Sequence, residues 1–105
     1  MTENNIANHL IGKYVIIRTY SAGVWFGILD KKENNEVILK DARRMYQWWC
    51  QKSISLSAVA LYGINQSKSR ICSPVNQVWL QAIEILPTND VATKSLLEAP
   101  EVQQS

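Results

Sequence analysis

Hydrophobic and polar residues alternate through the first half of the chain, and this pattern predicts antiparallel strands. β-Branched and aromatic residues fill GKYVIIRTY (12–20), and their side chains alternate as in a strand. After a short turn at 21–23, VWFGILDKKE (24–33) is the predicted return strand. A polar turn at 33–36 then leads into VILKDARRMYQWW (37–49). The first half is therefore predicted to form a sheet of three strands in sequence order.

The hydrophobic period changes in SISLSAVALYGIN (53–65), where apolar residues recur every three or four positions. This spacing predicts a short helix. Either Ser53 or Ser55 can cap its start, and Gly63 ends it. A helix is therefore inserted between strands.

The last third of the chain predicts two more strands and a second helix. After a polar, basic link at 66–70, the segment ICS (71–73) is a short strand and NQVWLQAIEIL (76–86) is a long one. Thr88 is the predicted N-cap of a final helix, which ends before Pro100.

These elements predict an α+β fold, with an antiparallel sheet of about five to six strands that can curl into a partial barrel. A short helix is inserted and another lies at the C-terminal end. The chain has 105 residues, enough for one domain with a single modest core. We expect a short N-terminal segment at 1–11, a folded core at 12–97 and a frayed tail at 98–105.

The composition is that of an ordinary folded protein, with 47% hydrophobic and 19% charged residues. No run approaches the roughly 18 apolar residues that a membrane span needs. The N-terminal sequence MTENNIANHLIGK lacks the basic flank and apolar centre of a signal peptide. We therefore expect a cytoplasmic protein with no membrane partner.

The residues that usually carry catalysis are scarce. Cys50 and Cys72 lie far apart without metal-ligand spacing, and the single histidine, His9, belongs to an Asn-rich segment near the start. Each cysteine is expected to be a small buried hydrophobe. A lone carboxylate such as Asp41 or Glu84, without a metal ion or a partner acid, is a poor catalyst of hydrolysis. The sequence therefore predicts no cofactor, no metal site and no enzymatic activity.

The formal net charge is only +2, but the charges are unevenly distributed. No carboxylate lies between Asp41 and Glu84. Two interpretations are open: a set of cations scattered over a solvated surface, or a positive field for a phosphate-bearing ligand. The cations of this interval are Arg43, Arg44, Lys52, Lys68 and Arg70.

The stretch KDARRMYQWWC (40–50) combines two arginines with three large aromatic residues. In a regular strand, Arg44, Tyr46 and Trp48 share one face and Trp49 lies on the other. Aromatic faces stack on nucleobases and arginines bind phosphate oxygens. Core and dimer-interface positions are also rich in aromatic residues, however. We expect Trp49 to be core, and Tyr46 and Trp48 to contact a ligand.

Two loops offer further candidates. The turn Ser21-Ala22-Gly23 can bring backbone amides and a hydroxyl to a phosphate, although hairpin geometry alone explains Gly23. The loop QSKSR carries Lys68 and Arg70 between a helix and a strand, where they either bind a ligand or are simply solvated.

Four segments, taken in order, resemble a phage and prophage family that includes the first Thoeris anti-defence protein. They are GKYVIIRTYSAGVWFG (12–27), DARRMYQWW (41–49), LSAVALYGI (56–64) and AIEILP (82–87). The resemblance extends from about Gly12 to Lys94, and the YSAG turn and the paired arginines before aromatics are its most specific parts.

This resemblance to the anti-Thoeris sponge family implies a molecular sponge. Such proteins bind a cyclic ADP-ribose isomer made by bacterial TIR-domain enzymes and hold it uncleaved. Some relatives also bind cyclic oligonucleotides of CBASS immunity at a separate site. Family members are homo-oligomers of dimer units, up to a hexamer, with ligand pockets between subunits. The expected partners are therefore a cyclic nucleotide and further copies of the chain, inside an infected bacterial cell.

On the same resemblance, arginines contact the phosphates, Tyr46 or Trp48 stacks on adenine, and the 21–23 turn supplies backbone contacts. The expected ligand-binding residues are Arg18, Ser21, Ala22, Gly23, Arg43, Arg44, Tyr46, Trp48, Lys68 and Arg70.

Two other classes of protein stay open from the residues alone. A small curved sheet can bind single-stranded nucleic acid. However, five cations and a net charge of +2 give only weak electrostatic attraction to a nucleic-acid polymer. Alternatively, the chain is a phage structural or host-interaction protein in which residues 40–50 form only an oligomer interface.

Overall fold

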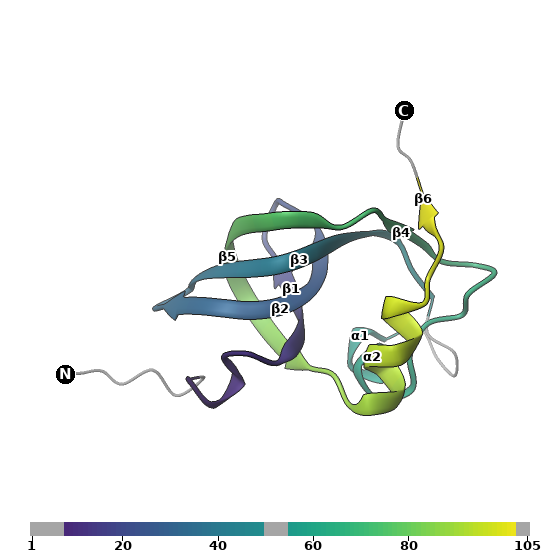
Figure 1. Ribbon diagram of the computed structural model, residues 1–105, viewed down its shortest axis with the longest axis horizontal. Coiled ribbons are helices and arrows are strands. Elements are labelled where there is room, and N and C mark those ends of the chain that lie inside the picture. Colours follow the sequence, from purple (N-terminus) through teal and green to yellow (C-terminus); the bar gives the residue numbers. More distant parts are fainter. Residues whose placement is uncertain (1–7, 50–54, 103–105) are drawn as a thin grey trace.

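The computed structural model describes residues 8–49 and 55–102 (Figure 1). Sequence predictions that fall outside these residues concern Cys50, Lys52, Ser53 and the segments 1–7 and 103–105.

An antiparallel meander forms the first half of the fold, as predicted. After a short 3-10 turn, η1 (Asn8–Leu10), the chain runs through β1 (Tyr14–Thr19), β2 (Val24–Glu33) and β3 (Glu36–Gln47). β1 pairs with β2, and β2 pairs with β3. Gly23 lies at φ 88°, a left-handed conformation that favours glycine and that closes the first hairpin.

A fourth long strand, β5 (Val75–Pro87), closes the sheet into a small barrel. Its first half pairs with β3 and its second half with β1. Since β1 and β3 both pair with β2, these four antiparallel strands form a ring (Figure 1). The α+β class is confirmed, and the curl of the sheet goes further than the predicted partial barrel.

Two short strands extend the sheet beyond the barrel. β4 (Arg70–Cys72) lies in line with β5 along β3, and the break between them contains Pro74, which has no N–H to donate to a ladder. β6 (Glu101–Val102) pairs with β4 in parallel. The frayed tail predicted from residue 98 was therefore wrong for these two residues.

The inserted helix is α1 (Leu56–Tyr62), and its ends follow the predicted signals. The side chain of Ser55 accepts a hydrogen bond from the amide of Ala58 at 3.1 Å, which is an N-cap. Gly63 ends the helix at φ 85°.

The C-terminal helix is α2 (Asp90–Leu97), and its cap differs from the prediction. Asn89 is the N-cap, because its side chain accepts from the amide of Ala92 at 2.9 Å. Thr88, the predicted cap, instead contacts the carbonyl of Tyr14 at 3.3 Å and the hydroxyl of Thr93 at 2.6 Å. Thr88 therefore ties the helix to the barrel.

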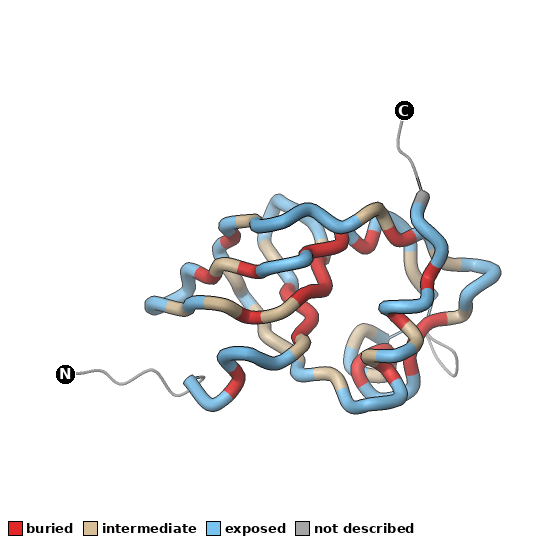
Figure 2. Tube along the Cα trace, in the orientation of Figure 1, coloured by how far each residue is buried: buried red, intermediate tan, exposed pale blue. Residues whose placement is uncertain are grey.

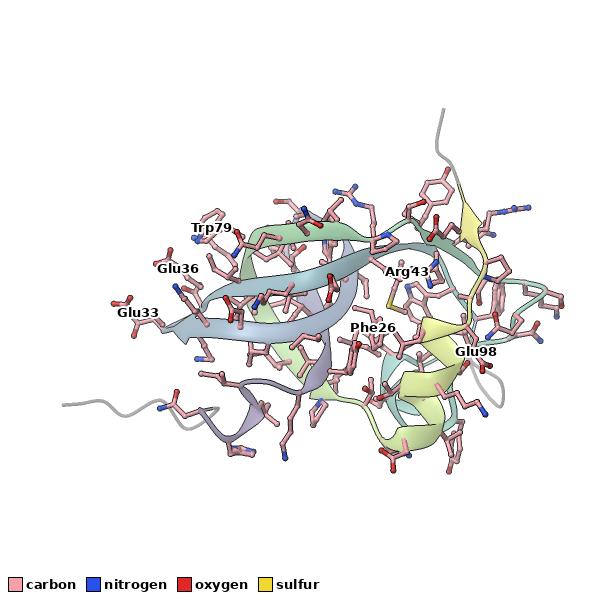
Figure 3. All side chains as sticks on the ribbon, in the orientation of Figure 1. Phe26, Glu33, Glu36, Arg43, Trp79 and Glu98 are labelled. Atoms are coloured by element: carbon pink, nitrogen blue, oxygen red, sulfur yellow. The ribbon has the colours of Figure 1, made fainter. Side chains whose placement is uncertain are left out.

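Buried residues form two clusters. Figure 2 colours the buried residues red along the strands of the barrel and on the helices. Inside the barrel, Val15, Ile17 and Trp25 belong to one cluster. Ile16 and Phe26 belong to a second cluster, which also contains residues of the helices. Figure 3 shows Phe26 on the side of the barrel that faces the helices. Alternate side chains along each strand thus contribute to the two clusters.

Within the described residues, no helix has the length and apolar character needed to cross a membrane.

Candidate ligand-binding face

The second half of β3 supplies three of the predicted site residues, and its side chains divide between two environments. Arg43 and Met45 are buried toward the helices, whereas Arg44 and Tyr46 are exposed. The strand therefore separates the paired arginines, because consecutive side chains of a strand point to opposite faces.

Arg43 is enclosed by the protein, with 4% of its surface exposed (Figure 3). Its Nε donates to the carbonyl of Cys72 at 2.8 Å, Nη1 to that of Leu96 at 2.9 Å and Nη2 to that of Ile71 at 3.3 Å. Burial lowers the pKa of this guanidinium, while nearby Glu101 and Cys72 act in the opposite direction. Because its donors face backbone carbonyls, we leave Arg43 out of the candidate site.

Arg44 is exposed on β3 and lies above an aromatic ring. Its Cζ atom is 4.8 Å from the ring centroid of Trp25, which pairs with it across β2 and β3. The indole Nε1 of Trp25 in turn donates to the carbonyl of Ala22 at 3.0 Å. The predicted 21–23 turn and Arg44 are thus linked through one buried tryptophan, a link that spacing in the sequence did not reveal.

The turn itself uses part of its hydrogen-bonding capacity internally. The amide of Ala22 donates to the hydroxyl of Thr19 at 2.8 Å, and that hydroxyl donates to the carbonyl of Gly23 at 2.7 Å. The predicted backbone contact from Ala22 therefore competes with an existing bond. Ser21 is exposed and borders a hollow of about 160 Å³.

A β-bulge near Tyr46 changes the phase of the strand. Met45 pairs with Ile71, but the next pair is Gln47 with Arg70, so Tyr46 and Gln47 together oppose Arg70. Tyr46 is 58% exposed. This position suits the ligand contact predicted for Tyr46.

The same bulge reverses the roles predicted for the two tryptophans. Trp48 was expected to contact a ligand, but it is half-buried and packs against the core between barrel and helices. Trp49 was expected to be core, but it is 43% exposed. The prediction for Trp49 was wrong because one extra residue in the strand moves every later side chain to the other face.

The exposed indole of Trp49 meets the basic loop before β4. Lys68 places its Nζ 5.8 Å from the centroid of the indole. The hydroxyl of Ser69 accepts from the amide of Trp49 at 2.9 Å, which fixes the loop against the end of β3. Lys68 therefore lies beside Trp49, and Arg70 pairs with Gln47 at the end of β3.

Arg18 is engaged elsewhere. It forms an ion pair with Glu84 across β1 and β5, with Nε 3.0 Å from Oε1. Both side chains are substantially exposed, so this pair contributes little to stability. A carboxylate at this distance also competes with any phosphate for the guanidinium.

Five exposed residues, four of them predicted and one newly found, lie on the second half of β3, just after it, or on the loop that enters β4. We call them together the cation–aromatic face, which consists of Arg44, Tyr46, Trp49, Lys68 and Arg70.

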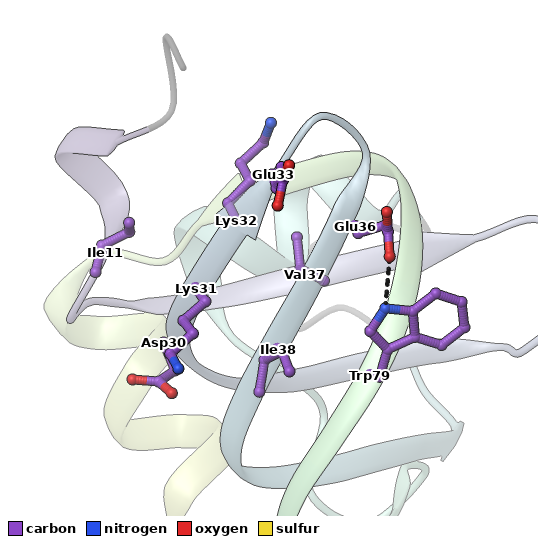
Figure 4. A pocket seen from close by; sticks show the side chains of 9 residues that line it. All are labelled: Ile11, Asp30, Lys31, Lys32, Glu33, Glu36, Val37, Ile38 and Trp79. Atoms are coloured by element: carbon purple, nitrogen blue, oxygen red, sulfur yellow. Dashed lines mark hydrogen bonds between the residues drawn. The ribbon is translucent and has the colours of Figure 1, made fainter. Parts of the chain in front are cut away.

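Sequence reasoning gave no role to Trp79, an exposed aromatic residue on β5. It is 55% exposed, and its Nε1 donates to Oε1 of Glu36 at 3.0 Å (Figure 4). It borders an open hollow of about 450 Å³ whose opposite side is formed by Asp30 and Lys31, with Ile38 between (Figure 4). The sequence carried no clear signal for this exposure, because Val78, Trp79 and Leu80 are consecutive apolar residues.

Among the described residues, no group of three or more histidine, cysteine or acidic side chains is placed to hold a metal ion.

The architecture defines a small α+β barrel domain with a helical pair packed on one side and an exposed cation–aromatic face. The chain belongs to the family of the domain of unknown function DUF6948, which matches residues 12–96. Comparisons with curated proteins and with solved structures give no match.

Proposed function

We propose that this protein is a phage-encoded sponge that binds a cyclic ADP-ribose isomer and holds it uncleaved. In the infected cell, such binding withholds the signal of TIR-domain enzymes from the effector that it activates. The proposal extends the resemblance in the sequence, and cyclic oligonucleotides of CBASS immunity are a second ligand class within it.

The observation that carries the proposal is the cation–aromatic face. Arg44 and Arg70 offer planar guanidiniums that match phosphate oxygens, and the exposed rings of Tyr46 and Trp49 offer stacking surfaces for adenine. No carboxylate occurs in the sequence between Asp41 and Glu84, so this interval adds no competing anion. This combination suits an adenine ring and a diphosphate.

The chemistry of these side chains favours retention of the ligand. Arginine and lysine stay protonated at neutral pH, and tyrosine and tryptophan are not bases there. Hydrolysis of a phosphoester or glycosidic bond needs a positioned general base or an activated nucleophile. A face made of cations and aromatic rings binds phosphates without supplying either.

The proposed ligand also explains why the protein would act as a homo-oligomer. Small-molecule sites usually enclose most of the ligand's surface. Tyr46 and Trp49 are exposed on an open face of a single copy, so a second copy is needed to cover a bound nucleotide. The proposal therefore includes ligand pockets shared between subunits.

A calorimetric titration tests the proposal. We expect a cyclic ADP-ribose isomer to bind with a micromolar or lower Kd, and linear ADP-ribose to bind more weakly. A mixed-sequence single-stranded oligonucleotide serves as the comparison. If only the oligonucleotide binds, with an affinity that falls steeply as salt is raised, the protein is instead a single-strand binding module, which a small barrel can also be.

A further inference from the structure

The hollow beside Trp79 lies on the outer face of the barrel, where the β2–β3 hairpin meets β5 (Figure 4). Trp79 pairs with Ile38, and Ile38 pairs in turn with Lys31. Directly paired residues share one face of a sheet, so these three side chains stand in a row across β5, β3 and β2. The half-buried Ile38 forms the floor of the hollow, and the exposed indole of Trp79 forms one wall.

Two glutamates lie at the hairpin end of this hollow. Glu33 and Glu36 pair directly across β2 and β3, and both are exposed. Like charges directly opposite each other destabilise a sheet. Within the described part of the chain, neither glutamate forms an ion pair. A local arrangement that costs stability without compensation inside the fold is typical of a functional site.

The lysines that line the hollow are directed elsewhere. The ammonium of Lys32 donates to the carbonyl of Asn34 in the hairpin turn. Figure 4 shows Lys31 directed toward Asp30, away from the two glutamates. The carboxylates at the hairpin end are therefore open to a cation from outside the chain.

The indole of Trp79 is fixed beside these carboxylates. Its Nε1 donates to Oε1 of Glu36 at 3.0 Å, so the ring N–H is already used and the second oxygen of Glu36 can accept from a ligand (Figure 4). What the ring offers a ligand is its face, and the face of tryptophan is the best cation–π partner among the aromatic side chains. The hollow thus combines a fixed aromatic face with two carboxylates.

From this arrangement we propose that the hollow binds an arginine side chain of a partner protein. The guanidinium stacks on the indole of Trp79 and donates to the carboxylates of Glu36 and Glu33. Arginine fits better than lysine, because its planar fork can stack and donate to carboxylates at the same time. Arginine and tryptophan are also the residues that most often dominate the binding energy of protein interfaces.

The shape of the hollow favours a polypeptide over a small free cation. It measures about 450 Å³ and is open to solvent, whereas small-molecule sites usually enclose most of the ligand. In a polypeptide, the residues beside the arginine cover the rest of the surface, where the exposed Ile11 offers an apolar contact. The inference goes beyond the nucleotide proposal, since it uses other residues and a ligand group of opposite charge.

An NMR titration of the full chain, without nucleotide, tests this site through the indole N–H resonance of Trp79. The probe is the peptide acetyl-Leu-Arg-Leu-amide, which we expect to shift this resonance saturably with a millimolar Kd. The same peptide with citrulline in place of arginine keeps the planar shape without the charge, and it should bind at least about tenfold more weakly. Spermidine, a free polycation, should also bind more weakly than the arginine peptide.

Charge-neutralising variants locate the site. Glu36→Gln keeps an acceptor for the indole N–H of Trp79 but removes the charge, and it should raise the Kd of the arginine peptide by about fivefold, as should Glu33→Gln. Glu98→Gln makes the same change at the opposite end of the molecule and should leave the Kd within about twofold of the wild type (Figure 3). All three positions are exposed, so the variants should stay folded.

Three results would overturn this inference: no saturable shift with the arginine peptide, a citrulline peptide that binds as tightly, or spermidine that binds more tightly than the peptide. The test is separate from that of the proposed function. A wild type that binds no cyclic nucleotide would refute the sponge but leave the peptide titration unaffected, and Glu36→Gln should bind the nucleotide as the wild type does.

Discussion

Replacing Arg43 with methionine is expected to lower the free energy of unfolding by about 3 kcal/mol, the largest effect of any arginine substitution in this chain. The side chain is 4% exposed and bonds to the carbonyls of Ile71, Cys72 and Leu96. Methionine fills similar space but leaves these buried acceptors without donors. Leu96 also lies in the last turn of α2, so a cation at the negative end of the helix dipole is lost.

Urea denaturation of the purified variants measures this change. Arg44→Met is the matched control, because its guanidinium is exposed and only stacks on Trp25. That contact is worth about 0.5 to 1 kcal/mol. Equal stability of the two variants would contradict the role of Arg43 as the tie between β3, β4 and α2.

Replacing Arg44 with glutamate is expected to weaken binding of a cyclic ADP-ribose isomer by at least about 100-fold, while the protein stays folded. The substitution removes a bidentate phosphate donor and sets a carboxylate beside the ligand's phosphates. Isothermal titration calorimetry of the wild type and the variant measures the difference.

Two controls accompany the Arg44 variant. Lys94→Glu makes the same change in charge on the exposed surface of α2 and should leave the affinity within about threefold of the wild type, as expected for a screened, distant charge. Arg44→Lys keeps the charge but loses the planar fork, so its affinity should fall between the two. An Arg44→Glu variant that binds as the wild type does would remove this residue from the site.

The arrangement of elements could be predicted from the sequence because local signals agreed. Alternation over β1 and β2, the Gly23 turn and the Ser55 and Gly63 caps all point to the same structure. Closure of the barrel was less predictable, because it depends on β5 pairing with both β1 and β3, contacts between segments far apart in the chain.

The candidate site was harder to predict, for one physical reason. The bulge at Tyr46 adds a residue to β3, and no turn residue or glycine marks it. An interpretation based on a regular strand therefore predicts an exposed Trp48 and a buried Trp49, whereas Trp48 is half-buried and Trp49 is exposed. The contacts of Arg43 were unpredictable for another reason. Periodicity indicates which face of the strand a side chain lies on, but it does not indicate that three backbone carbonyls on that face accept hydrogen bonds from it.

The exposure of Trp79 could not be predicted for a third reason. Its strand contains enough apolar residues to look buried on both faces, and only the register with β3 reveals that one face is open. Burial of alternate positions depends on which layers cover a sheet, and that is a property of the whole fold.

The most direct test of the sponge proposal is to mix the purified protein with the product pool of a TIR-domain enzyme, remove unbound nucleotide, denature the protein by heat and identify what is released. We expect intact cyclic ADP-ribose isomer in the supernatant from the wild type and none from Arg44→Glu. Release of a linear product would mean that the protein is an enzyme, and release of no nucleotide would contradict the proposed function and favour an interaction protein.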